Sequence, residues 1–181
     1  MTEKSKRHGS LSPEFALLGF IYEQPSHGYD LHQKLATELD SVWHISQSQA
    51  YNILSRLEKR GYISSTALEQ EKLPPRQVLQ ITQKGRDRFD EWLDMPTGSS
   101  VRAIRLELIT RLYFAQKIAP EKTQPLLDSQ SAEINATITR LELSLAEIPA
   151  GQTFSRLSLR LRIRQLRSAL DWLNECQKAL V

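Results

Sequence analysis

The sequence of 181 residues is poor in cysteine, glycine and histidine, and each shortage removes a class of protein. Cys176 is the single cysteine, which excludes a disulfide within the chain and a zinc site built from several thiolates. One lone thiol is typical of a reducing compartment, so we expect a cytoplasmic protein. The seven glycines form no phosphate-binding loop, and the four histidines lack metal-ligand spacing. We therefore expect no metal and no cofactor.

Long apolar runs and catalytic signatures are missing as well. The longest apolar run, residues 15–22, is far shorter than the roughly 20 residues that cross a bilayer. The first ten residues are basic, but no apolar core of a signal peptide follows them. The chain contains no Gly-x-Ser-x-Gly elbow and no helix with paired histidines. We expect a protein that is not an enzyme and does not enter a membrane.

The charge of the chain is unevenly distributed. Its formal net charge is +3, yet residues 1–95 hold 12 Lys and Arg against 13 Asp and Glu, a net of −1. Residues 96–181 hold 12 against 8, a net of +4. A basic chain favours a nucleic-acid-binding protein. Because the excess lies in the second half, bulk charge does not by itself locate a DNA-binding surface.

Capping residues and prolines divide the first half into short elements. The pattern predicts helices at 14–23, 27–39, 47–60 and 83–94, and strands at 62–70 and 76–81. Ser46 is a typical N-cap for the third helix, and Gly61 is a typical left-handed terminator. Residues 71–75 read as a loop, because Pro74 and Pro75 do not fit inside a β-ladder. Three helices, a hairpin and a fourth helix follow the order of a winged helix-turn-helix domain.

The second half is helical throughout. After a linker at 95–100, the pattern predicts helices at 101–118, 120–148 and 154–180. Two rows of apolar residues, here called seams, have alternating spacings of four and three residues. They are Ile134, Ile138, Leu141, Leu145 and Ile148, and then Leu159, Ile163, Leu166, Leu170 and Leu173. This stepping is typical of coiled coils, so the seams bury against each other or against a second chain. The predicted fold is mainly α with a small two-stranded β-hairpin. It comprises a basic tail at 1–11, a winged helix-turn-helix domain at 12–95 and an all-helical dimerisation domain at 101–181.

The third predicted helix has a face suited to DNA. At 100° per residue its apolar residues Ala50, Ile53, Leu54 and Leu57 share one side. The opposite side carries Ser48, Asn52, Ser55 and Lys59, flanked by Gln49, Tyr51 and Arg56. No carboxylate occurs before Glu58, and this absence favours DNA binding because a carboxylate that faces phosphate is repelled. Ser, Asn and Gln exchange hydrogen bonds with base edges in the major groove. The alternative interpretation is a solvated helix face that happens to be polar.

Three motifs resemble those of a known family. They are HGYDL at 27–31, AYNILSRLEKRGYI at 50–63 and ITQKGR at 81–86. Together they resemble the PadR family of transcriptional regulators over residues 12–94. The resemblance implies a winged-helix homodimer that binds an inverted-repeat operator, most often as a repressor, with Tyr51 near the DNA backbone. Residues 101–181 match the family's dimerisation region in helical character only, and the returning strand at 74–80 is less basic than is common in the family.

Pattern and resemblance together predict a set of DNA-binding residues. Those expected to contact DNA are Ser46, Gln47, Ser48, Gln49, Tyr51, Asn52, Ser55, Arg56, Lys59, Lys72, Arg76, His27, Gly28 and Tyr29. Base contacts are expected from Gln47, Ser48, Gln49 and Asn52, and phosphate contacts from Tyr51, Arg56, Lys59, Lys72 and Arg76. A small-molecule effector would act by favouring a different separation of the two recognition helices, and the sequence leaves open whether one exists.

Two further alternatives stay open at this stage. The nearly neutral first half is also compatible with a protein–protein adaptor that uses a winged-helix domain without binding DNA. The last predicted helix carries a cluster of Arg156, Arg160, Arg162, Arg164 and Arg167. This cluster is either a solvated face paired with Glu133, Glu142 and Glu147, or an accessory DNA contact.

Overall fold

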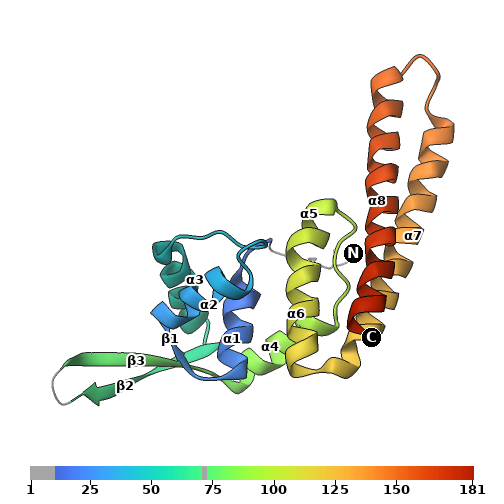
Figure 1. Cartoon of the computed structure of the whole chain (residues 1–181). Helices are drawn as coiled ribbons and strands as arrows, with labels where there is room; N and C mark the ends of the chain where they lie inside the picture. Colours follow the sequence, from blue (N-terminus) through green and yellow to red (C-terminus); the bar gives the residue numbers. More distant parts are fainter. Residues whose placement is uncertain (1–10, 71–72) are drawn as a thin grey trace, which may run out of the picture. The chain divides into compact units, whose positions relative to one another are not determined.

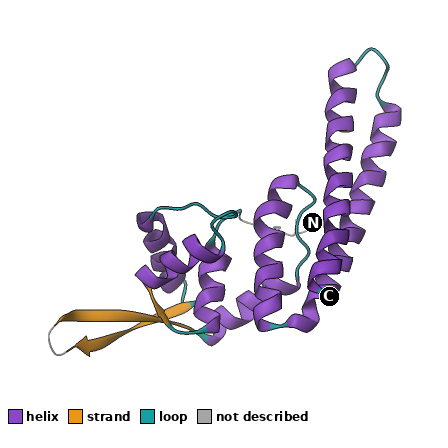
Figure 2. Cartoon of the chain, in the orientation of Figure 1, coloured by secondary structure: helices purple, strands orange, loops and turns teal. Residues whose placement is uncertain are grey.

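The computed structural model describes residues 11–70 and 73–181, with the backbone alone at 67–70 and 73–76. The described chain divides into two compact units, Leu11–Met95 and Pro96–Val181. Helices dominate both units, and the strands belong to the first (Figure 1, Figure 2). The tail expected at 1–11 lies outside the described residues, apart from Leu11. No helix among the described residues has the length and apolar character needed to span a membrane.

The first unit has the element order of a winged helix-turn-helix domain, as predicted. Its elements are α1 (Glu14–Glu23), β1 (Ser26–His27), α2 (Gly28–Glu38), α3 (Gln47–Lys59), β2 (Ile63–Gln70), β3 (Leu73–Ile81) and α4 (Gln83–Asp94). At the start of α3 the Ser46 hydroxyl accepts from the Gln49 amide at 3.2 Å, and the Gln49 side chain accepts from the Ser46 amide at 2.9 Å. This reciprocal capping box fixes where α3 begins. Gly61 ends it with φ +72°, the left-handed conformation expected there.

The sheet contains one strand more than the predicted hairpin. β1 pairs antiparallel with β3, which in turn pairs antiparallel with β2, so the strand order is β1-β3-β2. The two residues of β1, Ser26 and His27, lie opposite Leu79 and Val78. This short pairing attaches the start of α2 to the wing.

The loop predicted at 71–75 is wrong on its C-terminal side, because Pro74 and Pro75 belong to β3. The ladder is irregular there: Leu68 pairs with Arg76 and Gln70 with Leu73, so β3 has one residue more than β2 between these pairs. An irregularity of this kind accepts proline, which has no N–H to donate. β1 reaches only Val78 and Leu79, so the outer side of β3 is unpaired at the prolines.

The core of the first unit surrounds α1. Eight of the ten residues of α1 are buried, as the all-round apolar pattern indicates. The Phe15 ring stacks on Trp92 of α4 with centroids 4.6 Å apart. Leu31 and Leu35 of α2 and Leu57 of α3 complete the packing. The apolar side of α3 is therefore committed to the core, which leaves its other side outward.

The second unit ends in a helical hairpin. Its helices are α5 (Val101–Ala103), a π-helical segment (Ile104–Leu108), α6 (Ile109–Ile118), a short 3₁₀ turn (Pro120–Lys122), α7 (Thr123–Glu147) and α8 (Thr153–Leu180). The predicted seams meet within the chain, because Ile134 and Ile138 of α7 share one cluster with Ile163, Leu166 and Leu173 of α8. The alternative left open by the sequence is thus resolved in favour of packing of α7 on α8.

The predicted linker is shorter than its sequence indicates. Buried Gln130 of α7 accepts from the Thr97 amide at 3.1 Å and donates to the Thr97 carbonyl at 3.2 Å. The Ser99 hydroxyl donates to Glu133 at 3.1 Å. Residues 97–100 are therefore fixed to α7 inside the second unit, and Met95 and Pro96 remain as the connection between the units.

Candidate nucleic-acid interface

The outer side of α3 is exposed along its whole length. Ser48, Asn52, Ser55 and Lys59 are all exposed, as are Ser46, Gln47 and Gln49 at the helix start. The side chains of Ser48, Asn52, Ser55 and Lys59 make no hydrogen bond or ion pair with any described part of the chain. Their donors and acceptors are thus available to an external partner.

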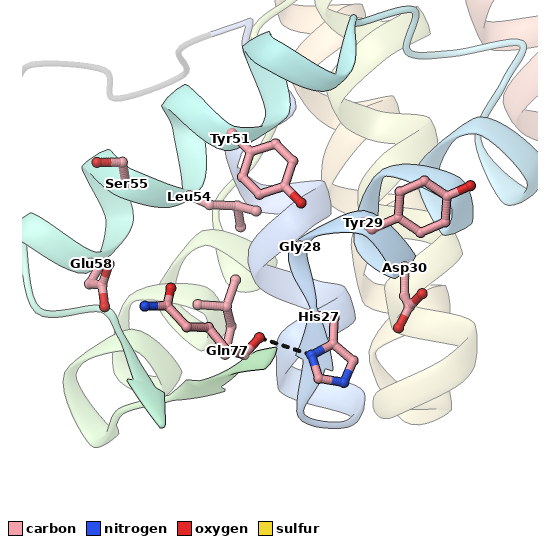
Figure 3. Close-up of a pocket in the computed structure, with 10 residues that line it drawn as sticks. His27, Gly28, Tyr29, Asp30, Tyr51, Leu54, Ser55, Glu58 and Gln77 are labelled. Carbon is pink, nitrogen blue, oxygen red and sulfur yellow. Dashed lines mark hydrogen bonds between the residues drawn. The ribbon is translucent and has the colours of Figure 1, made fainter. Parts of the chain in front are cut away.

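A groove runs beside this side of α3. It has a volume of about 660 Å³ and lies between α3, the start of α2 and β3 (Figure 3). Its lining comprises His27, Gly28, Tyr29, Asp30, Tyr51, Leu54, Ser55, Glu58, Gln77 and Leu79. The structure therefore brings together the His27–Tyr29 motif and Tyr51, which the sequence places more than twenty residues apart.

Gly28 is required for the position of the Tyr51 ring. A Cβ atom on Gly28 would lie 2.8 Å from Cε1 of Tyr51, closer than real side chains approach. Tyr51 nevertheless keeps 46% of its surface exposed, and Tyr29 keeps 52%. The Tyr29 hydroxyl also accepts from the Gln33 side chain at 3.0 Å. Two phenol groups are thus held at the mouth of the groove.

His27 has one ring nitrogen already committed. Its Nδ1 lies 2.9 Å from the carbonyl oxygen of Gln77 (Figure 3). Because a carbonyl only accepts, Nδ1 carries the proton in this contact, and Nε2 remains for a ligand. A neutral ring would accept at Nε2, and a protonated ring would donate there. Among the described residues no cluster of three or more His, Cys, Asp or Glu could hold a metal ion.

The remaining predicted residues are placed differently. Arg56 lies on the flank of α3 away from the groove, where it is bound to Glu14. The backbone of Arg76 lies in β3 opposite Leu68. Lys72 falls outside the described residues. The contribution of the wing tip therefore remains a prediction from the sequence.

Sequence reasoning missed a cluster centred on Glu14. This carboxylate is buried at the start of α1, and its Oε1 lies 2.8 Å from Nη2 of Arg88. Its Oε2 lies 3.3 Å from Nη2 of Arg56, and Oε1 lies 3.9 Å from Nη1 of Arg60. A carboxylate in a helix that is apolar all round indicates that a polar or charged partner is needed, but the sequence does not indicate which residues supply it.

The arginines of α8 divide between several partners. Arg167 pairs with Glu142 at 2.6 Å, one of the predicted ion pairs. Arg156 donates instead to the backbone carbonyls of Ile148 at 2.6 Å and Leu145 at 3.2 Å. These bonds satisfy acceptors at the C-terminal end of α7, which a helix leaves open. Arg156 and Arg167 thus have roles within the hairpin.

Comparison with known proteins gives two family matches. The model described as "Transcriptional regulator PadR-like family" matches residues 17–91. The model described as "Virulence activator alpha C-term" matches residues 104–181. The first match covers the winged helix-turn-helix unit, and the second covers most of the helical unit.

Individual relatives agree with these matches. The chain is similar to "Probable transcriptional regulator Rv1176c" of Mycobacterium tuberculosis (strain ATCC 25618 / H37Rv), with 25% identity covering 91% of this chain and 95% of that protein. It is similar to "Negative transcriptional regulator PadR" of Bacillus subtilis (strain 168), with 24% identity covering 76% of this chain and 75% of that protein. A solved structure of Bacillus subtilis PadR in complex with operator DNA has 20% identity and a TM-score of 0.44, covering 93% of this chain and 98% of that one. With family matches that extend from α1 to the end of α8, the chain belongs to the PadR-like family of transcriptional regulators and has a second unit of the virulence activator alpha C-terminal type.

Proposed function

We propose that this regulator is a homodimer that binds an inverted-repeat operator in duplex DNA and represses transcription. The observation that carries the proposal is the outer side of α3, where Ser48, Asn52, Ser55 and Lys59 are exposed and make no hydrogen bond or ion pair with the described residues. Side chains of this kind read base edges when a helix enters the major groove. The relative from Bacillus subtilis is a negative regulator whose structure contains operator DNA, which supports repression and this class of partner.

Each side chain has a role in the proposed complex. Gln47, Ser48, Gln49 and Asn52 contact base edges from the first turns of α3, and Ser46 and Ser55 add polar contacts beside them. Tyr51, Lys59 and the groove residues His27, Gly28 and Tyr29 bind the phosphate backbone. The wing contributes Lys72 and Arg76. Phosphate contacts position the protein, and base contacts supply the sequence preference.

A dimer is needed for useful selectivity. One recognition helix contacts few base pairs, and each mismatch costs only about 1–3 kcal/mol, so one half-site discriminates poorly. A two-fold dimer reads two half-sites about one helical turn apart. The surface of α8 supports such a dimer: Phe154, Leu157 and Leu161 are 87%, 53% and 59% exposed. At 100° per residue they lie opposite the seam that packs on α7, as a second chain would require.

Release by a small-molecule effector is part of the same proposal. The effector would bind one separation of the two recognition helices more tightly than the other. The effector can then weaken operator binding by at most the difference between its affinities for the two separations.

Selection of bound fragments from a genomic library tests the proposal directly. We expect an inverted repeat to be recovered, and we expect the affinity for it to fall linearly on a log–log plot against salt. Recovery of no preferred sequence, together with no duplex binding at low salt, would favour the protein–protein adaptor instead.

Two variants then separate base contacts from phosphate contacts. Asn52→Ala should lower the affinity for the recovered repeat by a factor of roughly ten, because a base contact is worth about 1–3 kcal/mol. The affinity for a scrambled duplex should change little. Lys59→Ala should weaken both duplexes to the same extent. If both variants lose affinity equally on both duplexes, the assignment of roles is wrong.

A further inference from the structure

Three arginines surround one buried carboxylate on the flank of α3 that faces α1. The Glu14 carboxylate forms an ion pair with Arg88 of α4, with an O–N distance of 2.8 Å. It also lies 3.3 Å from the guanidinium of Arg56 and 3.9 Å from that of Arg60, both at the end of α3. One negative charge cannot balance three guanidinium groups. The arrangement therefore keeps two positive charges in excess.

This excess stands out against the charge of its unit. Residues 11–95 contain nine Lys and Arg and twelve Asp and Glu, a formal net charge of −3. A further cation, Lys84, donates to the carbonyl of Arg60 at 2.8 Å and so adds positive charge at the end of α3. A unit with negative net charge can bind a polyanion only where its cations are gathered, and this cluster gathers four of the nine.

The cluster is rigid on its inner side and open on its outer side. The Arg88 guanidinium lies over the rings of Phe15 and Tyr62, with its central carbon 5.0 and 4.5 Å from their centroids, and donates to the Tyr62 hydroxyl at 3.2 Å. The side chains of Arg56 and Arg60 remain 43% and 52% exposed. Glu14 thus holds the half-exposed guanidinium of Arg56 through a hydrogen bond and attracts that of Arg60 at ion-pair distance, which lowers the entropy that these side chains lose on binding a ligand.

The position of the cluster on α3 indicates which ligand it meets. At 100° per residue, Arg56 and Arg60 lie on one side of the Ser48–Asn52–Lys59 line, and Tyr51 lies on the other side with the groove. The major groove is about 12 Å wide and admits one helix, so a helix inside it has a phosphate backbone on each side. The groove flank faces one strand, and the arginine flank faces the other.

We infer that Arg56 and Arg60 form a second phosphate-binding site for the opposite DNA strand, and that Glu14 is the positioning residue of this site. The inference rests on the proposed function, because it requires α3 to enter the major groove. Arg60 becomes a DNA contact that the sequence patterns did not indicate. Arg56 keeps the phosphate role expected from the sequence, but through a side chain that Glu14 holds in place.

Salt-dependent titrations with the recovered inverted repeat and a scrambled duplex of equal length test this site. Arg60→Ala should lower the affinity for both duplexes. The slope of log affinity against log salt should become shallower by about 0.9 for each protomer, because one phosphate contact is lost. Arg86→Ala is the matched control, since this arginine lies over the Tyr22 ring elsewhere on α4 and should leave the salt dependence unchanged.

Glu14→Gln tests positioning apart from charge. It should lower the affinity for the inverted repeat several-fold and make the salt dependence shallower, although it makes the unit more positive. Glu23→Gln removes an ion-paired carboxylate at the other end of α1, where Lys34 lies 2.5 Å away. This variant should neither lower the affinity for the inverted repeat nor make the salt dependence shallower. If Glu14→Gln fails to fold, the salt dependence of Arg60→Ala still tests the phosphate-binding site, because Arg60 is half exposed.

The outcomes separate this inference from the proposed function. Tighter binding of Glu14→Gln to both duplexes with a steeper salt dependence would mean that Glu14 competes with phosphate, which overturns the inference. Duplex binding by the wild-type protein with an unchanged salt dependence in Arg60→Ala overturns the inference and leaves the proposed function intact. Absence of duplex binding by the wild-type protein overturns both.

Discussion

At the scale of single residues, both units contain a buried carboxylate paired with arginine. In the second unit Glu107 and Arg111 lie 2.5 Å apart on successive turns, with side chains 8% and 2% exposed. Burial lowers the pKa of Arg111, and the neighbouring Glu107 charge acts in the opposite direction. The guanidinium thus depends on its carboxylate for compensation. Removing one partner of such a pair leaves a buried charge, which costs far more than the pair itself contributes.

Glu107→Ala should therefore destabilise the protein strongly. We expect the free energy of unfolding to fall by about 3 kcal/mol in urea titrations, the typical cost of breaking a buried pair. Glu142→Ala is the control, because its pair with Arg167 is exposed and should be worth less than about 1 kcal/mol. Equal losses in the two variants would show that burial does not govern this ion pair.

The contact between Gly28 and Tyr51 also belongs to this scale. Gly28→Ala places a methyl carbon 2.8 Å from Cε1 of Tyr51, so the ring must shift from its place beside the groove. We expect duplex affinity to fall by roughly tenfold while the thermal midpoint changes by only a few degrees, since Tyr51 is half exposed. Fluorescence anisotropy and thermal melting would measure the two effects.

Tyr51→Phe provides the comparison for that variant. It keeps the ring and removes the hydroxyl, so a loss similar to that of Gly28→Ala would assign the effect to the phenol group. Full affinity in Gly28→Ala would contradict a role for the ring position.

At the scale of elements, local sequence determines the helices well and the sheet less well. The start of α3 follows from Ser46 and Gln49, and its end follows from Gly61, because caps are local interactions. β1 has only two residues, too few for a periodic pattern, and exists because β3 offers a partner. Pro74 and Pro75 join β3 because of a ladder irregularity opposite Leu68 and Gln70, which depends on the register of both strands. Register is a property of the paired strands and is not visible in either one alone.

The candidate site divides in the same way. The outer side of α3 could be predicted because helical periodicity sorts its residues into two sides. The motif at 27–31 led to the prediction that His27, Gly28 and Tyr29 contact DNA, although the groove that they form with Tyr51 became visible only in three dimensions. The link between Glu14 and Arg56 joins residues 42 positions apart, so no local pattern could reveal it.

The two apolar sides of α8 lead to a prediction for this element. Leu161→Lys adds a charge to the exposed stripe and should convert the proposed dimer to a monomer in sedimentation experiments. The affinity for an inverted repeat should then fall by roughly 100-fold, because the second half-site is no longer linked to the first. Helical content should persist, since Leu161 lies away from the seam with α7.

Asn174→Lys is the matched control on another side of α8, and it should remain a dimer. A Leu161→Lys protein that sediments as wild type would place the dimer contact elsewhere.

At the scale of the whole molecule, charge is separated between the units. Residues 11–95 carry a formal net charge of −3, and residues 96–181 carry +4. The unit with the recognition helix is thus the more negative one, and its cations gather at the end of α3. Under the proposed function, a total charge or an isoelectric point would point to the helical unit, whereas the local arrangement of arginines supports the first unit as the DNA-binding one.

The hydrogen bonds between Gln130 and Thr97 have a consequence for modularity. Because they attach residue 97 to the helical hairpin, the natural splice point for a chimaeric regulator lies at Met95–Pro96, ahead of the Gly98–Ser100 stretch that a protein engineer would choose by eye. A graft cut within that stretch would leave the buried Gln130 amide to pair with a backbone segment taken from the other regulator.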